Sequence, residues 1–285
     1  MIRQISIIVI LCVALLGYAS CTDPAINARA ELQAAVDSYI NALKAGDSSI
    51  MPLTPESRYI QNMEEAVLGE GIWETGLNVD FHRSLLDTDI SETFTEVICA
   101  SNSHPYVLGT RLKIENGKIL EIETLVTDED DWLFNADVYL KHSQNENWDV
   151  LAVDQRSDRQ TLIAAADAYF DLFADGPPDA VPWGFPCNRL EGGIYTGKGV
   201  PEDTCYVGIP PGGDMQLVDR RYIVDEDIGS VVGIVRFGGE EGMPDSHLFR
   251  LEGGKVRYIH TLTVCLIPGC GFPELPGPTP EMDPQ

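Results

Sequence analysis

The sequence predicts an α+β protein in which one unit, a helix followed by antiparallel strands, occurs twice. Three observations lead to this prediction. An amphipathic helical pattern recurs at an offset of 130 residues, from Leu32 to Leu162. Short β-rich runs bounded by turn residues follow each helical pattern. A tight-hairpin pattern then closes each copy.

The chain begins with the features of a secretory signal peptide at residues 1–20. Arg3 precedes an apolar run from Ile5 to Leu16, and small residues follow that run. The run is shorter than the ~20 apolar residues that a transmembrane helix needs. We therefore expect a secreted, extracellular protein without a membrane partner. Cys21 follows the leader directly and leaves lipidation open, although Tyr18 stands where the bacterial lipid signal has a small aliphatic residue.

The first element of each copy is a helix that a glycine ends. Residues 32–39 and 162–169 share the order of apolar and polar positions, and they run on to Gly46 and Gly176. Residues 157–160, Ser-Asp-Arg-Gln, have the pattern of a capping box, which supplies acceptors for the free amide groups of a helix start.

The segments after each helix keep their order while their spacing changes. Arg58 and Arg189 occupy corresponding places, and Arg83–Asp87 corresponds to Arg221–Asp225 at an offset of 138 residues. The other matched pairs are 51–53 with 181–183, 71–73 with 193–195, and the β-rich runs 94–99 with 231–237. This order predicts one sheet for each copy.

The strongest match between the copies is the segment that ends each of them. Residues 111–125 and 248–262 align around Asn116-Gly117 and Gly253-Gly254. Such pairs form two-residue hairpin turns because both positions require positive φ. We divide the chain into a signal peptide (1–20), a first repeat (22–127), a connecting segment (128–156), a second repeat (157–266) and a disordered Pro-rich tail (271–285).

Cysteine content fits an exported chain. Removal of the leader takes away Cys12 and leaves six cysteines, which suggests three disulfides among 15 possible connectivities. We favour pairs that close short loops, Cys187–Cys205 and Cys265–Cys270, with Cys21–Cys99 as the remaining pair. There is no C-x-x-C motif, and we expect no zinc site.

Charge and missing motifs exclude several classes of function. A net charge of −26 repels phosphate backbones, so nucleic acid is not an expected partner. The sequence contains no G-x-S-x-G elbow, no H-E-x-x-H and no phosphate-binding loop. We expect no cofactor, a small-molecule ligand, and a monomer whose two repeats pair with each other.

The order of a helix, strands and a final Gly-Lys hairpin resembles the cone-shaped fold shared by nuclear transport factor two, ketosteroid isomerase and the SnoaL-like polyketide cyclases. The two-copy arrangement, with the leader, residues 182–187 (Pro-Trp-Gly-Phe-Pro-Cys), residues 189–193 (Arg-Leu-Glu-Gly-Gly) and Asp225, also resembles a fungal secreted family of unknown function. The first resemblance implies a curved antiparallel sheet with a pocket at its wide end. The second implies no chemistry.

The final hairpin of the second repeat supplies the catalytic candidates, His247 and His260. With regular pairing from the Gly253-Gly254 turn, the two histidines are opposite each other, on one face with Phe249, Leu251, Val256 and Tyr258. Imidazoles in a half-apolar pocket suit acid/base catalysis. They can equally be ordinary buried histidines. A metal site would need a third ligand, for which Asp225 and Glu191 are nearest by strand order, and we commit to none.

The ligand-binding candidates are Arg189, Glu191, Tyr195, Tyr258 and Asp225 in the second repeat and Arg58 and Glu123 in the first. An arginine beside a carboxylate binds an anionic or hydroxyl-rich ligand, or it forms a buried ion pair. Asp225, like Asp87, can also be a simple turn residue. Glu121 and Glu123 are either carboxylates with raised pKa values beside an apolar wall or side chains that face water.

These observations favour a secreted small-molecule pocket protein. One possibility is a cofactor-free lyase, isomerase or cyclase that uses histidine acid/base chemistry on a small hydroxylated or polyketide-like substrate. The alternative is a non-catalytic extracellular protein that binds a ligand or a cell-wall component. The repeats differ at Thr110/His247 and Glu123/His260, so we expect a specialised site in the second repeat.

Overall fold

The structure is a computed structural model that describes residues 24–209, 213 and 215–270. The predicted signal peptide, Cys21 and the predicted Pro-rich tail lie outside these residues. None of the helices in the described part is long and apolar enough to cross a membrane.

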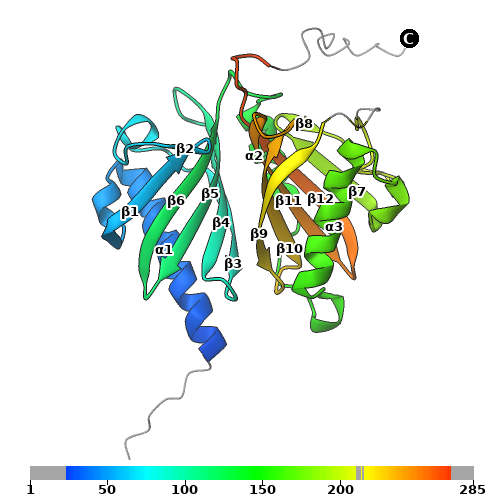
Figure 1. The fold of residues 1–285 in the computed structure, drawn as a ribbon, viewed down its shortest axis with the longest axis horizontal. Helices are drawn as coiled ribbons and strands as arrows, with labels where there is room; N and C mark the ends of the chain where they lie inside the picture. The colour runs from blue at the N-terminus through cyan, green and yellow to red at the C-terminus, as the bar shows by residue number, and fades with distance from the viewer. Residues whose placement is uncertain (1–23, 210–212, 214, 271–285) are drawn as a thin grey trace, which may run out of the picture.

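Two similar six-stranded sheets, each preceded by a helix, make up a two-domain α+β fold (Figure 1). The predicted repetition of helix and sheet is therefore confirmed. The first domain contains α1 (Pro24–Ala45), β1 (Leu53–Gln61), β2 (Glu64–Glu65), β3 (Phe81–Asp87), β4 (Glu92–Cys99), β5 (Tyr106–Glu115) and β6 (Lys118–Thr127). The second contains α3 (Arg159–Asp171), β7 (Trp183–Glu191), β8 (Ile194–Tyr195), β9 (Leu217–Asp225), β10 (Ser230–Phe237), β11 (Met243–Glu252) and β12 (Lys255–Thr263).

The connecting segment has its own helix, α2 (Ala136–Asn145), which begins at the side-chain cap of Asn135. Short 3₁₀ turns complete the described secondary structure, at Ser48–Ile50, Gly71–Trp73, Val153–Gln155, Leu172–Ala174 and Pro178–Ala180.

Both sheets are mixed, and this corrects the expectation of purely antiparallel sheets. The strand orders are β2-β1-β6-β5-β4-β3 and β8-β7-β12-β11-β10-β9. The four later strands of each domain form an antiparallel meander, but β1 pairs parallel with β6 and β7 pairs parallel with β12. The first strand after each helix, β1 or β7, thus runs in the same direction as the last strand of its sheet, β6 or β12.

The helix ends follow local chemistry. Asp158 caps α3 by accepting a hydrogen bond from the amide of Thr161 at 2.8 Å, one residue later than Ser157, the cap residue of the predicted box. Gly46 follows α1 with a positive φ of 63°. In the second repeat the left-handed residue is Asp175 (φ 62°), one position before the predicted Gly176.

The predicted hairpin turns are confirmed, but an irregularity follows each of them. Asn116, Gly117, Gly253 and Gly254 all have positive φ. Glu252 pairs with Lys255 and Leu251 with Val256, yet Arg250 pairs with Tyr258, so Arg257 is an extra residue in β12. An extra residue of this kind is a β-bulge, and it reverses the face of every later side chain on its strand.

Each sheet has a core against its own helix and a second core against the other sheet. Tyr39 of α1 and Tyr169 of α3 belong to the two helix–sheet cores. Leu85 and Phe94 of the first sheet pack with Ile223, Val232 and Leu248 of the second. The two sheets therefore face each other, with α1 and α3 on the outer sides and α2 beside the contact (Figure 1).

Reciprocal ion pairs join the two domains. Arg29 of α1 binds Asp225 of β9 through both carboxylate oxygens at 3.0 and 2.9 Å, and Asp225 also accepts the amide of Leu86. Arg159 of α3 binds Asp87 of β3, which accepts the amide of Val224. Asp225 is thus an interdomain contact and not a simple turn residue, because the opposite domain supplies its partners.

Candidate functional site

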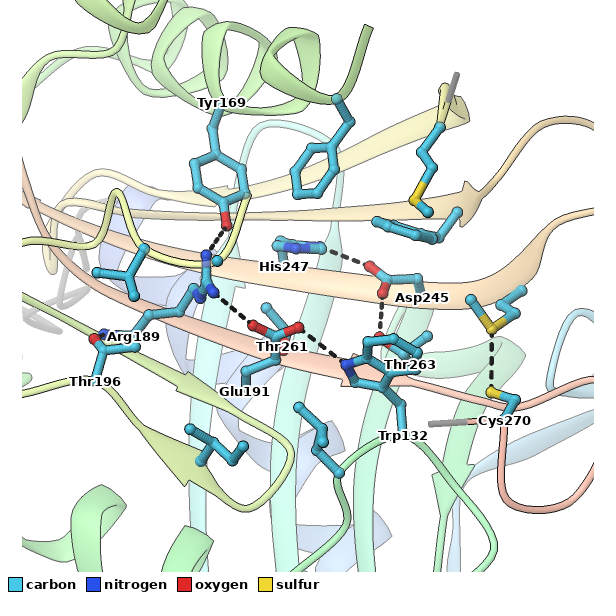
Figure 2. Close-up of a pocket in the computed structure, with 18 residues that line it drawn as sticks. Trp132, Tyr169, Arg189, Glu191, Thr196, Asp245, His247, Thr261, Thr263 and Cys270 are labelled. Carbon is cyan, nitrogen blue, oxygen red and sulfur yellow. Dashed lines mark hydrogen bonds and ion pairs between the residues drawn. The ribbon is translucent and has the colours of Figure 1, made fainter. Parts of the chain in front are cut away.

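The second domain contains a cavity of about 400 Å³ between α3 and the face of the sheet that α3 covers. Its polar wall comes from β7, β11 and β12, and Trp132 of the connecting segment lies beside it (Figure 2). Leu133 of the same segment also lines the cavity. Its lining includes two of the residues proposed for ligand binding, Arg189 and Glu191, and one catalytic candidate, His247.

An aspartate holds His247 in one orientation. Asp245 and His247 are two residues apart on β11, so their side chains share a face. Nδ1 of His247 is 2.6 Å from Oδ1 of Asp245, and the other carboxylate oxygen accepts the hydroxyl of Thr263. Because an ionised carboxylate can only accept, Nδ1 donates, and in the neutral form of the ring the lone pair is on Nε2. His247 as a residue is 4% exposed and lines the cavity.

Arg189 is the centre of a second polar group in the cavity. Its Nη1 donates to the hydroxyl of Tyr169 at 3.1 Å, and its Nη2 is 2.8 Å from Oε2 of Glu191. The other oxygen of Glu191 accepts the indole N–H of Trp132 at 3.0 Å. Figure 2 shows this chain of contacts beside the Asp245–His247 pair.

Burial and charge set the protonation states of this group. Burial raises the pKa of Tyr169 to about 12, although the Arg189 guanidinium opposes the increase. Burial favours the neutral form of Arg189, but Tyr169 and Glu191 hold its pKa above the ordinary value. At neutral pH Arg189 is therefore charged and Tyr169 keeps its proton. Since Tyr169 accepts from Arg189, its own O–H hydrogen is available as a donor.

The remaining wall of the cavity is apolar. Phe173 lies just after α3, and Phe237 is the last residue of β10. Met215 precedes β9, and Met243 is the first residue of β11. Ile194, Val207 and Met215 line the cavity and are 44%, 45% and 39% exposed. They form an apolar rim where the cavity meets solvent.

The first domain uses the corresponding space for aromatic packing. By strand register, Arg189 corresponds to Tyr59 and not to Arg58, because Tyr59 pairs with Ile122 as Arg189 pairs with Ile259. Trp73 packs edge-on against Tyr39, the counterpart of Tyr169, and against Tyr59 at ring distances of 5.9 and 6.2 Å. At the position of Arg189 the second domain therefore has a polar lining residue, where the first domain has the aromatic Tyr59.

The predicted equivalence of Arg58 and Arg189 is wrong by one residue. Because side chains alternate along a strand, this shift places Arg58 on the opposite face. Arg58 is 55% exposed at its side chain and pairs with Glu65 and Glu121 at the surface.

The expected pairing of His247 with His260 is also wrong. The bulge at Arg257 pairs His247 with Thr261 and Leu248 with His260. His247 faces α3, whereas His260 faces the other domain. Phe249 likewise pairs with Ile259 and not with Tyr258. Tyr258 stacks on Trp148 of the connecting segment, at a ring distance of 5.8 Å.

His260 is buried between two carboxylates at the domain contact. Its Nδ1 is 3.1 Å from Glu96 of β4, and its Nε2 is 2.6 Å from Glu146, which follows α2. Tyr139 donates to Glu96 at 2.7 Å, and Arg83 of β3 pairs with the same carboxylate. Burial opposes the charge of His260, but Glu146 and Glu96 raise its pKa to about 9. His260 is thus a buried cation that joins the domains.

The two remaining candidates also lie outside the cavity lining. Tyr195 stacks on His142 of α2 at a ring distance of 3.7 Å. Glu123 is buried and pairs with Arg111 of its own sheet and, through both oxygens, with Arg221 of the other. Neither of the two earlier alternatives for Glu123 is correct, because the opposite domain covers it. Burial alone would raise the pKa of Glu123, but the ion pairs with Arg221 and Arg111 outweigh burial and lower the pKa below its ordinary value.

Two of the favoured disulfides are present, Cys187–Cys205 and Cys265–Cys270. Cys187–Cys205 fastens the loop of Val207 and Gly208 to β7, and Cys270 lines the cavity. Cys99 is buried and has no disulfide partner among the described residues, and its expected partner Cys21 lies outside them. Within the described ranges, His, Cys, Asp and Glu side chains form no group of three that could hold a metal ion.

Sequence reasoning missed Asp245, Tyr169 and Trp132 as members of the site. The position of Asp245, two residues before His247 on a strand, was a usable signal because such residues share a face. The sequence showed Tyr169 only as the position that matches Tyr39 in the two helical segments. Trp132 could not be placed, since it reaches the cavity from the connecting segment.

The geometry defines a two-repeat α+β protein with a partly polar cavity in its second repeat that opens to solvent at an apolar rim. A family model described as a domain of unknown function (DUF8021) matches residues 155–263. This match spans α3 and the whole second sheet, the part of the chain that contains most of the cavity. No curated protein matches the chain.

Proposed function

We propose that the chain is a secreted small-molecule pocket protein whose second repeat performs acid/base chemistry on a small hydroxylated or polyketide-like substrate, without a cofactor. The observation that carries this proposal is the Asp245–His247 pair in the wall of a cavity that is polar on one side and apolar on the other. We further propose that both repeats are cone domains of the SnoaL-like kind, in a fungal secreted family. The sheet order and the covering helix support the cone-domain part of this proposal.

The reaction class we propose is a lyase, isomerase or cyclase reaction that starts with proton removal. Nε2 of His247 takes a proton from an acidic C–H or O–H group of the substrate, and Asp245 stabilises the imidazolium. Negative charge then develops on a substrate oxygen. Arg189 and the O–H of Tyr169 are the donors available to that oxygen. The proton returns from His247 to another substrate atom or to a leaving group, so the enzyme ends unchanged.

The test is proton exchange in D₂O. We expect the purified protein, incubated with a panel of hydroxylated aromatic ketones, to introduce deuterium beside the carbonyl of its substrate, as read by mass spectrometry. His247→Gln should lower the rate by at least about 100-fold, the usual contribution of a general base. His104→Gln, at a half-exposed surface histidine, is the matched control and should change nothing. An unchanged rate in His247→Gln would refute the role of His247.

The apolar rim favours a second candidate, a non-catalytic binder. Ile194, Val207 and Met215 keep large exposed fractions at the cavity mouth, where a captured ligand would cover them. A binder should be stabilised by its ligand in a thermal-shift screen and should show no exchange in D₂O. An enzyme should show both effects.

A further inference from the structure

We propose that the cavity of the second repeat selects uncharged ligands that carry a hydroxyl or carbonyl oxygen, and that Glu191 sets this selection. The inference rests on the proposed function, because it names the ligand class of the same cavity. It follows from how the charged groups of the lining are paired.

The lining offers no net positive charge to an anion. Its charged or titratable side chains are Arg189, Glu191, Asp245, His247 and Tyr169, and Tyr169 is neutral at pH 7 because burial raises its pKa to about 12. With His247 neutral there is one cation against two carboxylates, and with His247 protonated the charges cancel. Arg189 is the group that would bind a carboxylate ligand, but Glu191 is already 2.8 Å from its Nη2. A second carboxylate there would meet like charge in a desolvated place.

The lining offers no free carboxylate oxygen to a cation either. Glu191 uses one oxygen for Arg189 and the other for the indole of Trp132. Asp245 uses one oxygen for His247 and the other for Thr263. An ammonium ligand would have to share an oxygen that already accepts a hydrogen bond and would lose its hydration in a buried place, which disfavours its binding.

Donors to a neutral oxygen remain. Nε of Arg189 is buried and has no hydrogen-bond partner among the described residues, and neither has Oγ1 of Thr261, another residue of the lining. The hydroxyl hydrogen of Tyr169 is also available, since its oxygen accepts from Arg189. Opposite these donors are Phe173, Phe237, Met215 and Met243, which suit an aromatic or alicyclic ring. The geometry therefore fits an uncharged ring with an oxygen substituent.

Three probes with one ring system and different charge test this selection: 2-naphthalenemethanol, 2-naphthoate and 2-naphthylmethylamine. Their affinities are measured by quenching of tryptophan fluorescence at pH 7.5 on the full mature chain. We expect the alcohol to bind at least about tenfold more tightly than the acid or the amine. This comparison uses the wild-type protein and does not depend on whether a variant folds.

Glu191→Gln then tests the determinant. It frees the charge of Arg189, and naphthoate affinity should rise at least about tenfold relative to that of the alcohol. Glu65→Gln is the matched control, because Glu65 also pairs with an arginine, Arg58, but at the surface away from the cavity. That variant should leave all three affinities unchanged.

Each failure has its own meaning. Wild-type binding of naphthoate as tight as that of the alcohol, or the absence of binding by all three probes, would overturn the proposed ligand class. A folded Glu191→Gln protein with unchanged naphthoate affinity would overturn the role of Glu191. The deuterium-exchange result for His247 is independent of these affinities, so the proposed function stands or falls separately.

Discussion

Matched side chains of the two repeats have different partners. The hydroxyl of Tyr39 is 2.6 Å from that of Thr110, whereas Tyr169 binds Arg189. Thr110 and His247 are the matched hairpin positions that face these tyrosines. Thr110 satisfies a buried core, with a further hydrogen bond to Thr124. His247 occupies the matching position in the second repeat, where it lines the cavity. The same position therefore belongs to a packed core in the first repeat and to the candidate site in the second.

Trp73 is the residue that fills the first domain where the second is open. We expect Trp73→Ala to lower the free energy of unfolding by about 3–5 kcal/mol, because it removes a buried indole and leaves a cavity. Urea unfolding monitored by circular dichroism measures this loss. Indole added to the variant should recover part of the melting temperature, as apolar cavities bind apolar molecules of matching size. A loss below about 1 kcal/mol would show that Trp73 is not a core residue.

In both final hairpins, one extra residue changes the face of the sheet on which the later side chains lie. Both carry the same irregularity, with Leu120 as the extra residue in β6 and Arg257 in β12. Because it occurs in both copies, it belongs to the repeat. Beyond it, Ile259 and Thr261 face the helix while Tyr258 and His260 face the other sheet. The strand ends therefore serve both the cavity and the domain contact.

The helix that covers the cavity depends on its cap. Asp158 accepts the amide of Thr161, so we expect Asp158→Ala to cost about 1 kcal/mol of unfolding free energy. Asp158→Asn should cost much less, since asparagine caps helices about as well as aspartate. Urea unfolding of the two variants side by side gives the comparison. Equal losses in both would mean that the charge and not the hydrogen bond matters.

The contact between the domains is built from buried, paired charges. Asp87 and Asp225 form reciprocal clamps with Arg159 and Arg29. Glu123 joins Arg221 at one place, and His260 joins Glu96 and Glu146 at the place related to it by the repeat. Each charge meets its opposite across the contact. Losing one partner leaves the other buried without compensation, which is strongly destabilising.

The pH dependence of stability follows from His260. Its pKa is about 9 in the folded protein, against ~6.5 for an unperturbed histidine. The folded state therefore holds an extra proton between these values. Its stabilising effect is complete below pH ~6.5 and is lost as pH rises through 9, a change of about 3 kcal/mol. The groups that face His260 are Glu96, Glu146, Arg83 and Tyr139.

Urea unfolding of the wild-type protein at pH 6.5 and 9.5 measures this change directly. His260→Gln should remove most of the difference between the two pH values. If that variant does not fold, Glu146→Gln provides the second comparison, with a smaller difference because one of the two carboxylates is gone. Wild-type stability that is equal at both pH values would refute the assigned role of His260.

The order of residues by itself determined the duplication, the helices and the hairpins. These features depend on local patterns: apolar spacing in residues 32–39 and 162–169, the cap at Asp158, and the positive-φ turns at Asn116-Gly117 and Gly253-Gly254. It also placed Arg189, Glu191 and His247 near one another, because strand order and alternation limit where side chains lie. The short-loop disulfides were predictable because their cysteines are close in sequence.

Only the tertiary structure decided which histidine lines the cavity. The bulge at Arg257 has no local signature in the sequence, yet one extra residue moves His260 from the cavity to the domain contact. His260, Glu123 and Asp225 each have a partner in the opposite domain, at sequence separations that no local pattern encodes. Packing between the two sheets decided the roles of these charges, because burial makes each of them require a partner.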